Sequence, residues 1–489
     1  MESLKEKTAK GLVWGGMNNV VLQLVGVVFG IILGRTLNQA DFGMMAMISV
    51  FSLVATTLQD SGFKTGLANM KDPKAEDFNS VFWFNILMGT GLYLLLFFCA
   101  PLIARFYDVP ELTALSRYAF LSIIIASLGT AQSAWLFKRL RARQMAKASM
   151  AAVIISSVVG ASMAIAGMAY WSLATQGLVY VAVNTAMLWH YSEWRPTMKI
   201  DFGPVKRLFP FSMKILATNI TTNVNNNVVN ILLGRYFGKH STGVYNQAYQ
   251  WDLKAYSLVQ GMVNQVAQPV LVSLDDEPER QLKAFRKMMR FTAFIAFPLL
   301  FGLALVAREF IVIAITEKWL PSVELLQLLC ISGAVIPLAT LMSNLIISRG
   351  ESGTYFRSTL AFCLTQIAVL IAIHGMGIRA IVTAYVAINI VWLLVWHWFV
   401  RRLTGYRFIH LLLDTLPFAF AAALTMAVTW LLTLQIGNLW ALLFSRIAIA
   451  AAIYFIIMKA AHAKILDESI AFLLKKSTLK NVNCRTKKN

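Results

Sequence analysis

Apolar runs of about 20 residues, the length that a helix needs to cross a lipid bilayer, recur along nearly the whole chain. The composition agrees: 58% of the 489 residues are apolar and 14% are charged, whereas soluble domains carry about a quarter charged residues. A membrane β-barrel would show alternating polarity instead. The sequence therefore predicts an all-α integral membrane protein. Its fourteen predicted spans are 11–33, 42–58, 81–103, 117–136, 147–169, 171–190, 208–234, 244–270, 291–315, 323–347, 357–375, 378–400, 411–434 and 439–461.

The second and eighth predicted spans are the weakest apolar runs. Thr56, Thr57, Gln59 and Asp60 close the second span. The eighth span is punctuated by the polar residues Asp252, Lys254, Gln260, Asn264 and Gln268.

The net charge of +21 comes from lysines and arginines at the ends of the apolar runs. Most of them fall on the side of the N-terminus, so the positive-inside rule predicts cytoplasmic N- and C-termini, in agreement with an even number of spans. Nucleic-acid binding is not expected, because no basic amphipathic module is present. Lys5, Lys7 and Lys10 precede a full-length span with no cleavage site after it. We therefore expect the first helix to be an uncleaved anchor.

Catalytic and metal-binding patterns are not apparent in the sequence. The four cysteines form no CxxC pair and the six histidines lack ligand spacing, so neither a disulfide framework nor a metal site is expected. A phosphate-binding loop of the P-loop type is also missing. We expect no enzyme activity and no cofactor, and any driving force would be a gradient of H⁺ or Na⁺.

An internal repeat organises the chain. The motif Leu33-Gly34-Arg35 with Gly43 returns as Leu233-Gly234-Arg235 with Gly243, and an ungapped overlay of 14–43 on 214–243 gives seven identities in thirty. The two copies are about six membrane crossings apart, and an even number of crossings returns the chain to the same side. The second copy therefore has the same orientation as the first, so the repeats are parallel. The predicted organisation is an N-terminal lobe 1–195, a cytoplasmic linker 196–207, a C-terminal lobe 208–403, accessory spans 404–462 and a basic cytoplasmic tail 463–489.

Amide side chains gather on the repeated first helix of each lobe, and paired-lobe transporters bind cargo near the lobe interface. Asn219, Asn223, Asn226 and Asn230 are spaced by four, three and four residues, which places them on one helical face. Asn18, Asn19 and Gln23 occupy the first copy. Such amides suit hydroxyl-rich ligands. The alternative is hydrogen bonding between membrane helices.

Charged residues inside spans are the other candidates, because burying them in a bilayer is costly. Lys254 is a candidate for binding a phosphate of the cargo, and Asp60 and Asp252 are candidates for binding a coupling ion. The alternative places Asp252 and Lys254 at a span end, where their side chains reach water. Two residues apart, they do not share a helical face.

Several motifs, in this order, resemble the polysaccharide transporter family of the multidrug, oligosaccharidyl-lipid and polysaccharide exporter superfamily, over residues 1 to 410. They are Leu33-Gly34-Arg35, Asp41-Phe42-Gly43, Asp60-Ser61-Gly62-Phe63, the Phe137-Lys138-Arg139-Leu140-Arg141-Ala142-Arg143 loop, and the turn from Gly167 to Leu173 with Trp171. Gln39 departs from the pattern, because relatives commonly have Pro there.

The resemblance implies a flippase of the bacterial inner membrane. Its cargo would be an undecaprenyl-diphosphate-linked oligosaccharide for O-antigen, capsule or exopolysaccharide assembly, moved by alternating access. The implied partners are this cargo, membrane lipids and a polysaccharide polymerase or export machinery. Alternatives are a multidrug exporter of the same superfamily, a peptidoglycan-precursor flippase and, from another class, a polysaccharide polymerase.

Overall fold

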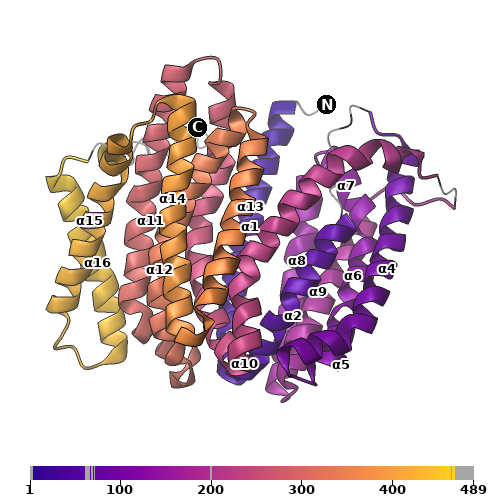
Figure 1. Cartoon of the computed structure of the whole chain (residues 1–489), viewed down its shortest axis with the longest axis horizontal. Coiled ribbons are helices and arrows are strands. Elements are labelled where there is room, and N and C mark those ends of the chain that lie inside the picture. Colours follow the sequence, from indigo (N-terminus) through magenta and orange to yellow (C-terminus); the bar gives the residue numbers. More distant parts are fainter. Residues whose placement is uncertain are drawn as a thin grey trace, which may run out of the picture. The chain divides into compact units, whose positions relative to one another are not determined.

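The computed structural model describes residues 4–60, 67, 70, 72–198, 201–463 and 465–468; side chains are described from residue 14, without those of Asp60 and of residues 204–215. Every regular element in these ranges is helical (Figure 1). The helices are α1 (Leu4–Thr36), α2 (Gln39–Asp60), α4 (Ala75–Tyr107), α5 (Leu112–Ala119), α6 (Leu121–Ser127), α7 (Thr130–Lys138), α8 (Ala142–Ile165), α9 (Ala169–Tyr191), α10 (Gly203–Ser273), α11 (Pro278–Ile315), η1 (Glu317–Trp319), α12 (Pro321–Ser348), α13 (Ser352–Ala372), η2 (His374–Met376), α14 (Ile378–Thr404), α15 (Phe408–Leu432) and α16 (Leu439–Ala460).

The helices confirm the predicted fold class, an all-α protein that crosses the membrane many times. In the described part, ten helices are long and apolar enough to span a bilayer, or eleven if the bent pair Leu112–Ser127 and Thr130–Lys138 is one span. All fourteen predicted ranges fall on helices, and α10 covers two of them. α10 is broken at Gly238, whose φ of 75° and ψ of −179° lie outside the helical region. The number of crossings stays a prediction.

Side chains cap the starts of α2 and α16. At α2, the Asp41 N–H donates to Asn38 Oδ1 and the Asn38 N–H donates to Asp41 Oδ2, both at 3.0 Å, which satisfies two backbone donors reciprocally. At α16, Asn438 Oδ1 accepts from the N–H groups of Trp440 and Ala441. These caps fix where the chain turns between neighbouring helices.

The chain divides into two compact units. Unit 1 comprises Met1–Gln247, Ala314–Trp319 and Thr359–Ile381, and unit 2 comprises Ala248–Ile313, Leu320–Ser358 and Val382–Asn489. One buried apolar cluster of unit 1 joins α2, α4, α5, α6 and α9 through Met47, Tyr107, Leu115, Ile123 and Ala174. The predicted lobe boundaries at 195 and 208 stay a prediction.

The repeated glycines contact the other copy of the repeat within unit 1. A Cβ atom on Gly43 would lie 1.7 Å from the Lys239 carbonyl oxygen, and one on Gly243 would lie 1.8 Å from that of Gln39. Only glycine allows the two backbones to come this close. The glycines therefore fix the contact between the two repeats.

The repeated arginines also make equivalent contacts. Arg35 Nε donates to the Ala314 carbonyl at 2.8 Å, near the end of α11, and Arg235 Nη1 donates to the Phe106 carbonyl at 2.9 Å, near the end of α4. Each guanidinium thus satisfies a carbonyl left open at a helix C-terminus. The repeat in the sequence is a repeat in the packing.

Candidate functional site

A polar cavity of about 400 Å³ lies within unit 1. Four parts of the chain supply its wall: the end of α2, the α6–α7 bend, α9 and the first half of α10. The lining residues are Thr56, Thr57, Gln59, Ala126, Gly129, Thr130, Ser133, Tyr180, Val181, Asn184, Thr185, Leu188 and Asn219. None of these residues carries a charge, and most carry a hydroxyl or an amide. The cavity is in the size range of small-molecule sites.

A break in the helical path positions one wall of the cavity. The predicted single span 117–136 is instead three short helices, and the axis bends by 41° between Ser127 and Thr130. Gly129 lies at this bend, where an added Cβ would come within 3.0 Å of Thr185 Oγ1. The bend places Thr130 and Ser133 on the cavity.

Part of the polar wall is held by hydrogen bonds within the protein. Gln59, which is 2% exposed, donates from Nε2 to Asn85 Oδ1 at 3.3 Å and to Thr130 Oγ1 at 2.9 Å. Asn223 Nδ2 donates to Thr57 Oγ1 at 2.7 Å. Hydrogen bonds within the protein hold these amides in place, so they shape the wall rather than adapt to a ligand.

Other polar groups of the wall have no hydrogen-bond partner within the described part of the protein. These are the hydroxyls of Ser133 and Tyr180 and the amides of Asn184 and Asn219. Each amide offers two donor hydrogens and an acceptor oxygen, and each hydroxyl offers one donor and an acceptor. The cavity therefore presents a neutral surface rich in donors and acceptors, which matches a ligand rich in hydroxyl groups.

The four asparagines predicted to share one face of a helix lie in different surroundings in the structure. Asn219 is exposed and lines the cavity, and Asn223 is half-buried and bonded to its wall. Asn226 is exposed, whereas Asn230 is buried and its Oδ1 has no hydrogen-bond partner. The four asparagines face more than one environment, so only the first two belong to this cavity.

The candidates on the first helix are not among the described residues that line the polar cavity. Asn18 and Gln23 are half-buried, and Asn19 is exposed. Asp60 closes α2, and its side chain lies outside the described residues. A role for these residues in cargo binding or ion coupling stays a prediction.

Asp252 and Lys254 both lie in unit 2, and no ion pair between them is found. Asp252 is 1% exposed, and its Oδ1 has no hydrogen-bond partner. A Cβ on Gly333 would come within 2.3 Å of Asp252 Oδ1, so the carboxylate packs directly against α12. Lys254 instead places Nζ 5.0 Å from the ring centroid of Trp251, a cation–π distance. A carboxylate buried in this way requires a proton or a cation.

Several lining residues were not among the sequence candidates. Three of them were visible in the sequence as polar residues that weaken the apolar run of the second span, namely Thr56, Thr57 and Gln59. Thr130 and Asn184 left no such signal, since a single polar residue in an apolar helix is ordinary and no spacing connects the two. Only the bend before α7 and the packing of unit 1 bring these residues to one cavity.

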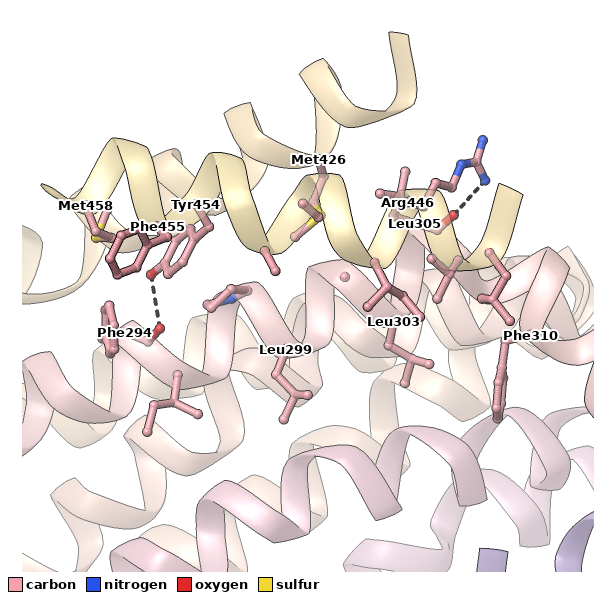
Figure 2. A pocket seen from close by; sticks show the side chains of 18 of the residues that line it. Phe294, Leu299, Leu303, Leu305, Phe310, Met426, Arg446, Tyr454, Phe455 and Met458 are labelled. Atoms are coloured by element: carbon pink, nitrogen blue, oxygen red, sulfur yellow. Dashed lines mark hydrogen bonds between the residues drawn. The ribbon is translucent and has the colours of Figure 1, made fainter. Parts of the chain in front are cut away.

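An apolar groove of about 690 Å³ lies in unit 2, between α11 and the helices α15 and α16 (Figure 2). Pro298, Leu303, Met426 and Phe455 are among its lining residues. Arg446 Nη1 donates to the Leu305 carbonyl at 3.1 Å, and the Tyr454 hydroxyl donates to the Phe294 carbonyl at 3.0 Å (Figure 2). The groove is a second candidate site, with the opposite chemistry to the polar cavity.

Comparison with known proteins agrees with this architecture. A family model described as "Polysaccharide biosynthesis protein" matches residues 32–324. The teichuronic acid biosynthesis protein TuaB of Bacillus subtilis (strain 168) is 24% identical over 407 residues, covering 81% of this chain and 83% of TuaB. The succinoglycan biosynthesis transport protein ExoT of Rhizobium meliloti (strain 1021) is 24% identical over 433 residues, covering 87% of each chain.

A solved structure extends the likeness to three dimensions. The lipid II flippase MurJ, in an inward closed conformation, matches with a TM-score of 0.71 over 94% of this chain and 100% of MurJ, at 15% identity. At this identity the likeness shows the fold alone.

Proposed function

The chain belongs to the family of polysaccharide biosynthesis proteins, and from this membership we propose that it is a flippase for a lipid-linked oligosaccharide. The cargo is an undecaprenyl-diphosphate-linked repeat unit, which crosses the bacterial inner membrane for O-antigen, capsule or exopolysaccharide assembly. The word "transport" in the name of ExoT and the flippase fold shared with MurJ support this direction. The chain acts without catalysis.

The observation that carries the proposal is the neutral polar cavity of unit 1. Polar side chains within a membrane span are costly to expose to lipid, so a cavity rich in hydroxyls and amides suits a polar occupant. Ser133, Tyr180, Asn184 and Asn219 offer unbonded donors and acceptors there. A sugar unit has the matching array of hydroxyl groups. We assign this cavity to the oligosaccharide part of the cargo.

The apolar groove of unit 2 has the chemistry to hold an isoprenoid chain (Figure 2). In a bilayer such a chain is already surrounded by apolar lipid tails. Moving it into the groove therefore adds little hydrophobic free energy of binding, and the groove would select the chain by shape and packing. Its function is then to orient the lipid rather than to bind it strongly.

Alternating access requires two states that bind an ion or the cargo differently. The buried Asp252, with an unbonded Oδ1, is our candidate for the coupling site. Asp252→Asn keeps the shape of the side chain but removes its charge. We expect this variant to lose the dependence of cargo flipping on the H⁺ or Na⁺ gradient in proteoliposomes, while the purified protein keeps its thermal stability. Unchanged gradient dependence would exclude Asp252 as the coupling site.

The test of the function compares matched variants in a strain that lacks the chromosomal gene. Deletion should abolish surface polymer and accumulate lipid-linked oligosaccharide on the cytoplasmic face, and the wild-type gene should reverse both effects. Thr130→Val and Asn184→Leu each remove a polar group from the cavity. Strains that carry these variants should make about fivefold to tenfold less surface polymer than the strain with the wild-type gene, the effect of one lost hydrogen bond. The control is Thr425→Val, the same change at a buried threonine of α15 outside the cavity.

Two results would count against the proposal. If polymer stays normal in the deletion strain and only drug sensitivity changes, the protein is an exporter of small molecules. If both cavity variants complement as well as Thr425→Val, the cavity does not hold the cargo. Asn184→Leu breaks no hydrogen bond within the described protein, so its loss of function is not a loss of folding.

A further inference from the structure

A second polar pocket lies in unit 2, between the start of α13 and the last turns of α14. Its volume is about 470 Å³. Its wall comprises Glu351, which directly precedes α13, and Thr354 and Arg357 from the first turns of α13. The last turns of α14 supply the other lining residues, Trp398, Phe399, Arg402 and Leu403. The pattern of basic residues in the sequence places this pocket at the cytoplasmic face of the membrane.

Two exposed guanidinium groups of the pocket have no carboxylate partner within the described part of the protein. Arg357 donates from Nε to the Gly353 carbonyl at 3.3 Å, which leaves its two terminal nitrogens unbonded. The guanidinium carbon of Arg402 lies 4.7 Å from the ring centroid of Trp398. Stacking on the indole holds the planar guanidinium group of Arg402 in place. The parallel N–H donors of such a group match the oxygens of a phosphate group.

The remaining polar groups are compatible with an anion. The lining carries two arginines and one carboxylate, that of Glu351, and so has a net positive charge. The Glu351 carboxylate accepts a hydrogen bond from Thr354 Oγ1 at 2.8 Å. α13 begins beside the pocket, at Ser352, and the first turn of a helix directs N–H groups and a positive dipole end toward an anion.

The apolar part of the pocket indicates that the anion belongs to a lipid. Trp398 is 49% exposed, and its ring centroid lies 4.8 Å from that of Phe399. Trp at the end of an apolar helix typically lies at the headgroup level of a bilayer. A free phosphate would make no use of the indole, Phe399 and Leu403 beside the arginines.

We propose that this pocket binds the phosphate group of an anionic membrane lipid from the cytoplasmic leaflet. Arg357 and Arg402 hold the phosphate oxygens, and Trp398, Phe399 and Leu403 pack against the glycerol and the first carbons of the acyl chains. Basic pockets between membrane helices bind anionic headgroups in this way. The site is separate from the two assigned to the cargo and does not depend on the transport function.

The test measures lipid retained by the purified full-length protein in native mass spectrometry. The probes are phosphatidylglycerol, phosphatidylcholine and inorganic phosphate. Arg357→Gln and Arg402→Gln should each lower the bound fraction of phosphatidylglycerol about tenfold, and Arg402→Lys, which keeps the charge but not the parallel N–H donors, should lower it less. Arg401→Gln is the matched control, since it removes the same charge one residue away from a side chain that does not line the pocket.

The outcomes separate a built lipid site from its alternatives. Retention of phosphatidylglycerol over phosphatidylcholine, lost in the two pocket variants and kept in Arg401→Gln, supports the proposal. An equal loss in Arg401→Gln would show only a general attraction to the positive surface. Displacement of the lipid by millimolar inorganic phosphate would show a soluble phosphate site instead. Either of these two results overturns the proposal. Because Arg357 and Arg402 are exposed, their replacement should leave the melting temperature unchanged.

Discussion

Gly43 and Gly243 show how two single residues determine a contact between the two copies of the repeat. The Cβ position of each glycine is occupied by the carbonyl group of the other copy, at Lys239 and Gln39. A backbone carbonyl cannot rotate away as the end of a side chain can. Both glycines are therefore required by the packing rather than by their own backbone angles, since neither has a positive φ.

We expect Gly43→Ala and Gly243→Ala each to destabilise the protein by at least about 1–3 kcal/mol, the cost of overpacking. The measurement is the melting temperature of the purified protein in detergent. Gly91→Ala in α4 is the control, because its Cβ would meet no atom within 4 Å. That change should be neutral or stabilising by up to about 1 kcal/mol. Equal melting temperatures for all three variants would mean that the backbones separate at low cost.

At the same scale, the candidate site was only partly readable from the sequence. The spacing of the asparagines identified Asn219 and Asn223, because helical periodicity places residues on a face without reference to the rest of the fold. The same rule could not separate Asn226 and Asn230 from them, since their surroundings depend on which helices pack nearby. Thr130 and Asn184 reach the cavity through tertiary packing, which no local pattern encodes.

At the scale of elements, the two C-terminal helices are each fixed to α11 by buried charges. Asp414 of α15 is fully buried and accepts from Arg286 Nε at 2.9 Å and from Arg290 Nε at 2.5 Å. Arg446 of α16 is 8% exposed and donates to Glu309, which is 2% exposed, at 2.9 Å. The partner of Arg446 on α11 could not be predicted from spacing, because it lies 137 residues away in the sequence.

Removing one partner of the buried pair should cost more than removing both. Arg446→Met leaves Glu309 as an unpaired buried charge, and we expect a loss of about 3–5 kcal/mol, whereas Arg446→Met with Glu309→Gln should lose clearly less. Thermal unfolding of the four proteins in the double-mutant cycle measures this difference. The exposed pair Lys287–Glu468 serves as control, since Lys287→Met should cost less than about 1 kcal/mol. A double variant as unstable as the sum of the single variants would show that the two charges do not interact.

At the scale of the whole molecule, hydrophobic runs predicted the all-α membrane fold because a bilayer permits few backbone solutions. The breaks within these runs were not predicted. α10 turns at Gly238, and the span 117–136 divides into three helices. Both breaks depend on packing and backbone geometry, which leave little trace in hydrophobicity.

The orientation in the membrane is also a property of the whole chain, and we propose that both termini face the cytoplasm. Single cysteines at Gly437, between α15 and α16, and at Asp276, between α10 and α11, test it in a background without the native cysteines. We expect a membrane-impermeant maleimide to label Gly437→Cys in intact spheroplasts and Asp276→Cys only after lysis. The reverse pattern would invert the orientation and would place the α13–α14 pocket in the outer leaflet.

The close contact at Gly43 and Gly243 also limits which mutations the two copies of the repeat can accept during evolution. Each copy of the repeat provides the surface against which the other copy fits, so a backbone shift in one half alters what the other half tolerates. Exchange of one half with that of a distant relative should therefore fail even when both halves are sound in their own parents. A change in one copy of the repeat is then tolerated only together with a matching change in the other.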